Sequence, residues 1–224
     1  MAAMVRRRIR FVFENGDERL AEVTALFFDM GGVLLTNGWD RPSRRAAAEK
    51  FGLDWDDFED RHELLMHGFE TGAVSLDEYL RRAVFYRERR FSKQDFIDFI
   101  YSQSQAMPET LAVLEKLAAR KRYLIAALNN ESRELNEYRI RTFNLREYFE
   151  VFLSSCYLGV RKPNEAIYKL ALSITQRAGE ECVFVDDREL NLEFARELGM
   201  HAIQFKNAAQ LEKELKEFGV EVED

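Results

Sequence analysis

Thr24-Ala25-Leu26-Phe27-Phe28-Asp29-Met30-Gly31-Gly32-Val33-Leu34-Leu35 is the segment that decides the fold, because it joins an apolar run to an aspartate and two glycines. The run is apolar on both faces, as in a strand of a sheet that helices cover on both sides. Glycines let a backbone approach a ligand closely. An ionised carboxylate at such a place must be hydrogen-bonded, paired with a cation or bound to a metal. An aspartate that caps a helix or fixes a turn is an equally good interpretation of this segment alone.

The bulk composition describes a chain that can bury a substantial core. Its 224 residues are 46% hydrophobic and 33% charged, which fits one domain or a core domain with a smaller insert. The formal charge of −7 comes from well-mixed acidic and basic side chains and disfavours binding to a nucleic-acid backbone. No stretch approaches the roughly 20 apolar residues that cross a bilayer, and no secretory-type apolar core follows the first residues. We therefore expect a cytoplasmic protein with no nucleic-acid or membrane partner; the sequence does not indicate its oligomeric state.

Residues 1–22 are predicted to be an N-terminal extension that lies outside the main domain. Alternation in Arg8-Ile9-Arg10-Phe11-Val12-Phe13, followed by Glu14-Asn15-Gly16-Asp17, is compatible with a β-hairpin.

Two kinds of sequence make up the rest of the chain. Residues 37–105 are helical throughout, with apolar spacings of three and four and with Ser75 and Ser92 at helix starts. Residues 23–36 and 106–224 instead alternate strands with helices. The chain is therefore predicted to be an α/β protein, with a doubly wound parallel sheet and an inserted all-helical domain.

Polar residues gather where the predicted strands end. They are Asp29, the pair Asn129-Asn130, Lys162 and the pair Asp186-Asp187. In parallel sheets, ligands bind outside the carboxyl ends of the strands. Three acids, two amides and a lysine at one edge indicate a site much more strongly than one acid would.

The charges of these residues suggest a chemistry. Three neighbouring carboxylates raise one another's pKa unless a cation intervenes. Lys162 offsets one charge, and a divalent metal would offset two more. Hard oxygen ligands suit Mg²⁺ and argue against zinc. Mg²⁺ beside a lysine and amide donors would make a receptor for a phosphoryl group, with Asp29 as the nucleophile.

Four segments in order resemble the four motifs of the haloacid dehalogenase-like hydrolases. They are Phe28-Asp29-Met30-Gly31-Gly32-Val33-Leu34, Leu128-Asn129-Asn130, Gly159-Val160-Arg161-Lys162-Pro163 and Phe184-Val185-Asp186-Asp187-Arg188-Glu189-Leu190-Asn191. The helical insert is similar to the small cap of that superfamily's first subfamily. The likeness covers residues 23 to 220.

The resemblance implies a role for each matching residue. Asp29 matches the nucleophile and a metal ligand, and the backbone carbonyl of Gly31 matches a second ligand. Asp186 matches a direct Mg²⁺ ligand that Asp187 and Asn191 support. Lys162 matches the catalytic lysine. The substrate-binding positions are Gly31, Gly32, Asn129 and Asn130.

Gly31 departs from the usual pattern, because phosphatases of the family place a second aspartate there as acid and base. Such help is typically worth about 10²–10⁴-fold in rate. The leading hypothesis is a Mg²⁺-dependent phosphatase of a small phosphorylated metabolite. A metal-independent haloacid-type dehalogenase fits Gly31 but not the paired Asp186-Asp187. A weakly active binding or regulatory protein is the third interpretation.

Overall fold

The computed structural model describes residues 11–12, 18–19 and 22–222. Within them a parallel sheet has the strand order β5-β4-β3-β6-β7. Its strands are β3 (Ala25–Phe28), β4 (Leu124–Ala127), β5 (Val151–Phe152), β6 (Cys182–Asp186) and β7 (His201–Gln204). Because the order reverses beside the central β3, the sheet is doubly wound. The predicted fold class is confirmed.

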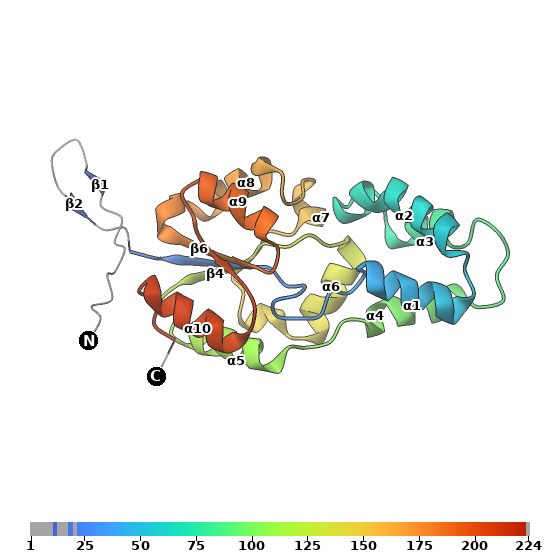
Figure 1. The fold of residues 1–224 in the computed structure, drawn as a ribbon, viewed down its shortest axis with the longest axis horizontal. Helices are drawn as coiled ribbons and strands as arrows, with labels where there is room; N and C mark the ends of the chain where they lie inside the picture. Colours follow the sequence, from blue (N-terminus) through green and yellow to red (C-terminus); the bar gives the residue numbers. More distant parts are fainter. Residues whose placement is uncertain (1–10, 13–17, 20–21, 223–224) are drawn as a thin grey trace.

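Helices cover both faces of this sheet (Figure 1). The helices of the α/β part, with two 3₁₀ turns, are α5 (Pro108–Ala119), α6 (Arg133–Thr142), η1 (Leu145–Glu147), α7 (Ser155–Leu158), α8 (Glu165–Thr175), η2 (Gly179–Glu181), α9 (Glu189–Glu197) and α10 (Ala208–Glu217). On one face, α5 and α10 share a core with Leu26 and Phe28. On the other, α8 and α9 share a core with Ala25 and Phe27. Alternate residues of β3 thus point to opposite faces, which explains why the strand is apolar throughout.

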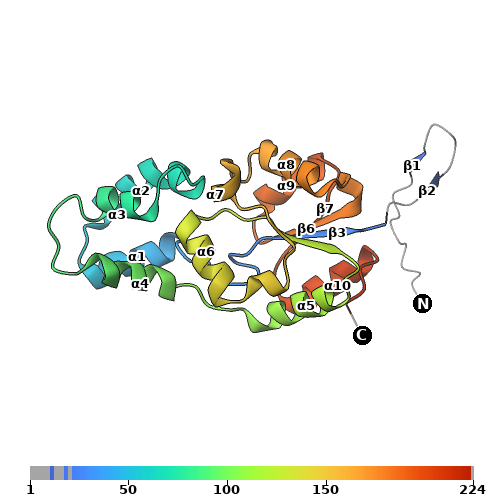
Figure 2. The ribbon, with the colours of Figure 1, turned by 180° about the vertical axis from the view of Figure 1, so that it is seen from behind.

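Four helices between β3 and β4 form a second body at one end of the molecule (Figures 1 and 2). They are α1 (Arg41–Phe51), α2 (Trp55–Glu70), α3 (Leu76–Ala83) and α4 (Lys93–Ser102). Asp40, Asp54, Ser75 and Ser92 cap their N-termini through side-chain oxygens. Their apolar faces form a separate core around residues such as Phe58, Tyr79 and Phe96. We call this body the cap and keep residues 37–105 as its proposed bounds.

Two linkers join the cap to the sheet, and they run side by side. The backbone N–H of Thr36 donates to the carbonyl of Gln105 at 2.9 Å, and that of Met107 donates to Leu34 at 2.9 Å. Leu35 and Ala106 form an antiparallel bridge between them. The cap is therefore attached through a short two-stranded ribbon, which we call the hinge ribbon (residues 34–38 and 103–107).

In the N-terminal extension, β1 (Phe11–Val12) and β2 (Glu18–Arg19) pair antiparallel. The turn expected at residues 14–17 lies outside the described residues. None of the helices in the described part of the chain combines the length and apolar character needed to cross a bilayer.

Candidate active site

Asp29 lies directly after β3, at the switch point between β3 and β6. Its backbone N–H donates to the Val185 carbonyl at 2.9 Å, and its Oδ1 accepts from the Met30 N–H at 2.8 Å. Only 8% of the residue is exposed. The pKa of Asp29 is raised to about 7, mainly by burial; Lys162 opposes this shift, and the charges of Asp186 and Asp187 add to it. The strand thus delivers a carboxylate that requires a cation to stay ionised at neutral pH.

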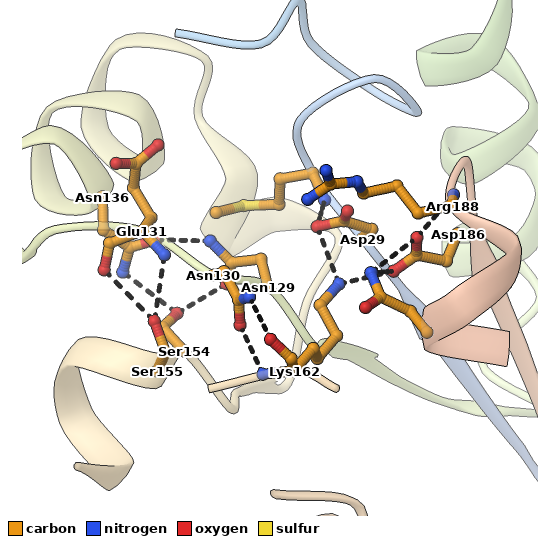
Figure 3. Close-up of polar contacts among 12 residues, drawn as sticks. Asp29, Asn129, Asn130, Glu131, Asn136, Ser154, Ser155, Lys162, Asp186 and Arg188 are labelled. Carbon is orange, nitrogen blue, oxygen red and sulfur yellow. Dashed lines mark hydrogen bonds and ion pairs between the residues drawn. The ribbon is translucent and has the colours of Figure 1, made fainter. Parts of the chain in front are cut away.

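Lys162 provides one such cation (Figure 3). Its Nζ lies 3.2 Å from Asp29 Oδ1 and 2.6 Å from Asp186 Oδ2, and the side chain is 1% exposed. Burial lowers the pKa of Lys162, but Asp186 and Asp29 outweigh it and the pKa is raised overall. The ammonium group therefore stays charged between the two carboxylates.

Asp186 ends β6 and is held by donors on its other sides. Its Oδ1 accepts from the Arg188 N–H at 2.8 Å, and the amide of Asn191 lies 3.0 Å from both carboxylate oxygens. Asp187 follows it, and burial and then the charge of Asp186 raise the pKa of Asp187. The two residues reach the site because β6 runs parallel to β3 and ends at the same edge of the sheet.

Asp29, Asp186 and Asp187 can present one oxygen each within 4.8 Å of one another. These three carboxylates face a single ammonium group, so the cluster carries excess negative charge in a largely buried place. A divalent cation would balance it, and all three donors are the hard oxygens that Mg²⁺ prefers. The residues present therefore fit a Mg²⁺ ion.

Of the two glycines that follow Met30, Gly32 makes the approach of Asp187 sterically possible. Gly32 has φ +77°, and a Cβ there would lie 2.6 Å from Asp187 Oδ2. A side chain at Gly32 would thus push Asp187 away from the cluster. Gly31 is different, because its φ is not positive and a Cβ would meet the side-chain oxygen of Asn37 at 2.9 Å.

The two predicted amides lie beside the cluster, but their side chains have partners within the protein. Asn130 Nδ2 donates to the Lys162 carbonyl at 2.8 Å, and its Oδ1 accepts from the Lys162 N–H at 2.8 Å. Asn129 Nδ2 donates to Asn136 at 3.0 Å, and its Oδ1 accepts from Ser154 at 2.8 Å. Asn130 thus fixes the backbone that carries Lys162, and Asn129 joins a buried network (Figure 3). Contact of either side chain with a substrate remains a prediction.

Several residues that bind the cap to the core carried no recognisable signal in the sequence. Ser155 Oγ donates to the Glu70 carbonyl at the end of α2, at 2.6 Å. Arg161 pairs with the carboxylate of Glu70 at 2.7 Å. Arg139 is 2% exposed and lies on the buried face of α6, together with Leu135 and Ile140. Helical periodicity places Arg139 on α6 but does not reveal its partners.

A family model described as haloacid dehalogenase-like hydrolase matches residues 23–199. A chloroplast flavin mononucleotide hydrolase of Arabidopsis thaliana is 28% identical over 214 residues, which cover 93% of this chain and 83% of that protein. A D-ribitol-5-phosphate phosphatase of Bacteroides thetaiotaomicron is 26% identical over 203 residues, covering 85% and 95%. Among solved structures, a haloacid dehalogenase family enzyme of Bacteroides thetaiotaomicron in complex with magnesium and inorganic phosphate aligns with a TM-score of 0.70 at 23% identity. That alignment covers 83% of this chain and 95% of the other.

Proposed function

The chain belongs to the haloacid dehalogenase-like hydrolases, and we propose that it is a Mg²⁺-dependent phosphatase of a small phosphorylated metabolite. The observation that carries the proposal is the convergence of Asp29, Asp186 and Asp187 around Lys162, at the carboxyl ends of β3 and β6. The names of the two relatives, one acting on flavin mononucleotide and one on ribitol 5-phosphate, support the substrate class.

In the proposed reaction, a carboxylate oxygen of Asp29 attacks the phosphorus atom, the bond from phosphorus to the ester oxygen breaks, and that oxygen takes a proton from water and leaves as the alcohol. Water then hydrolyses the aspartyl phosphate and frees Asp29. Lys162, held by Asn130, offsets negative charge on Asp29 and on the transferring phosphoryl group. Asp29, Asp186, Asp187 and the backbone carbonyl of Gly31 would hold Mg²⁺, which when bound supplies positive charge beside that group.

Asp29 must be ionised to attack. Since burial raises its pKa to about 7, a nearby positive charge determines how much of the nucleophile is available at neutral pH. Lys162 supplies part of that charge, and a bound divalent cation would supply the rest.

A metal-independent dehalogenase is the second candidate, and the glycine at position 31 favours it. Against it stands the pair Asp186 and Asp187, because a metal-free site has little use for two extra acids, one buried and one half-buried. Where the protein acts is also a proposal: we place it in a reducing compartment, by preference the cytoplasm, since Cys156 and Cys182 are both free.

Phosphate release with and without Mg²⁺ tests the proposal, with flavin mononucleotide, ribitol 5-phosphate and other sugar phosphates as substrates. Asp29→Asn, which keeps the shape of the side chain, should abolish release. Full activity of Asp29→Asn would remove the nucleophile assignment. Chloride release from 2-chloropropionate without metal would instead favour the dehalogenase.

A further inference from the structure

Arg139 of α6 contacts both linkers of the cap at once. Its Nε donates to Ser104 Oγ at 3.0 Å, and its Nη2 donates to the Thr36 carbonyl at 3.1 Å. Its Nη1 lies 3.0 Å from a carboxylate oxygen of Glu131. Every nitrogen of this buried guanidinium group therefore has a partner: two on the hinge ribbon and one on the core.

The guanidinium group fills the space beside the outgoing linker. A Cβ on Gly38 would overlap Arg139 Nη2, and one on Gly31 would lie 3.6 Å from Nη1. The linker can pass this close only because residue 38 has no side chain. Arg139 thus sets the path of the chain between the loop after Asp29 and the first helix of the cap.

Glu131 connects Arg139 to a second contact between the cap and the core, which Ser155 makes with Glu70. It directly follows Asn130, and its backbone N–H donates to Ser155 Oγ at 3.0 Å. That same oxygen donates to the carbonyl of Glu70, the last residue of α2. Glu131 therefore stands between the hinge ribbon and the edge of the cap that faces the core.

The cap is also fitted closely at this second contact. Gly72, with φ +76°, lies so near the carbonyl of Cys156 that a Cβ would overlap it. Glu70 pairs with Arg161, the neighbour of Lys162. A shift of the hinge ribbon would move α2 relative to Arg161 and so disturb the surroundings of the catalytic lysine.

We propose that Arg139 is a positioning residue. Through its contacts with Glu131 and the hinge ribbon, it holds the cap in the position in which Glu70 contacts Ser155 and Arg161. Its effect on catalysis rests on the proposed phosphatase function. Its effect on the cap does not. Small displacements matter because a misplacement of about 1 Å can reduce a rate about 100-fold.

The test compares Arg139→Met with the double variant Arg139→Met/Glu131→Gln. The single variant leaves the buried Glu131 carboxylate without its cation and can fail to fold, whereas the double variant removes that charge as well. Arg141→Met, an exposed arginine on the same helix, is the matched control.

Two measurements are made on each folded variant. The first is amide hydrogen exchange of Thr36 and Met107, whose N–H groups bond across the hinge ribbon, with the amides of β3 as internal reference. The second is kcat and KM for the sugar phosphate that the native protein hydrolyses fastest, chosen because it is large enough to contact the cap, and for acetyl phosphate, which is much smaller.

In the double variant we expect faster exchange in the hinge ribbon with unchanged exchange in β3. We also expect kcat/KM for the sugar phosphate to fall about 100-fold, with kcat for acetyl phosphate nearly unchanged. Exchange equal to that of the native protein would overturn the inference, and so would an equal loss for both substrates. If the native protein hydrolyses no phosphate ester, the proposed function fails, and hydrogen exchange alone decides the role of Arg139 in holding the cap.

Discussion

His62, in the cap, should make the stability of the protein depend on pH. Trp39 Nε1 donates to Tyr79 Oη at 3.0 Å, and Tyr79 Oη lies 2.9 Å from His62 Nδ1. Because an indole N–H only donates, the tyrosine oxygen accepts there and its own proton is available to His62. This arrangement suits a neutral imidazole that accepts the tyrosine proton at Nδ1. His62 is 4% exposed.

The surroundings oppose protonation of this ring. The pKa of His62 is lowered from its ordinary 6.5 to about 4, mainly by burial and then by the charge of Arg44, with Glu59 opposing and Arg161 adding to the shift. The unfolded chain therefore binds more protons than the folded one between these two values. The contribution of His62 to stability is complete above pH 6.5 and is lost as the pH falls toward 4. Proton linkage gives a loss of about 2 kcal/mol between pH 7 and pH 5.

His62→Gln removes the titration while leaving an oxygen that can accept from Tyr79. Urea unfolding followed by tryptophan fluorescence reports on the cap, because Trp39 and Trp55 are the protein's two tryptophans. The free energy of unfolding should fall by about 2 kcal/mol more in the native protein than in this variant between pH 7 and pH 5. Subtracting the change in unfolding free energy of the variant from that of the native protein cancels the contributions of the other titratable groups.

His67→Gln, on the same helix but exposed, is the matched control and should follow the native pH dependence. Parallel curves for the native protein and His62→Gln would refute the assignment of a neutral, buried imidazole.

Three further predictions concern the site. Gly32→Ala should weaken Mg²⁺ binding severely, measured by calorimetry, since its Cβ would strike Asp187 Oδ2; Gly219→Ala, also at positive φ but in open space, should leave binding unchanged. Gly31→Asp should raise phosphate release, by up to about 10²-fold, because only the flexible side chain of Asn37 obstructs the new Cβ; unchanged release would show that another group already moves the proton. Removal of metal with EDTA should abolish phosphate release and leave circular dichroism unchanged, with recovery on adding Mg²⁺; activity that survives EDTA would contradict a metal-dependent site.

Local patterns predicted the fold because each of them has one structural solution. The apolar run before Asp29 suits only a strand covered on both faces, and β3 is the central strand of the sheet. Ser75 and Ser92 predicted helix starts, and in the structure the side-chain oxygen of each accepts a hydrogen bond from a backbone N–H in the first turn of its helix. The position of the site could be predicted for the same reason, because a polar residue that directly follows a buried strand lies at the carboxyl end of that strand. This is why Asp29 and Asp186 could be expected to approach each other.

The hydrogen-bond partners of individual side chains could not be predicted in this way. The sequence places Asn130 at the edge of the sheet, but nothing local indicates that its amide bonds the backbone of Lys162. Arg139 is harder still, because it lies on a polar helix and its partner Thr36 is 103 residues away. Such contacts depend on how two distant segments pack, and helical periodicity carries no information about that.

The hinge ribbon also has a consequence for how such proteins diversify. Thr36 and Gln105 are hydrogen-bonded neighbours, so the chain leaves the sheet and returns to it at almost the same point. Everything between them could be replaced by a tight turn, or by a foreign helical module with adjacent ends, without lengthening any connection in the sheet. Recombination at these two residues would exchange the cap and keep the carboxylates that we propose to be catalytic, which offers a direct way to build chimeras and to test whether the cap sets substrate choice.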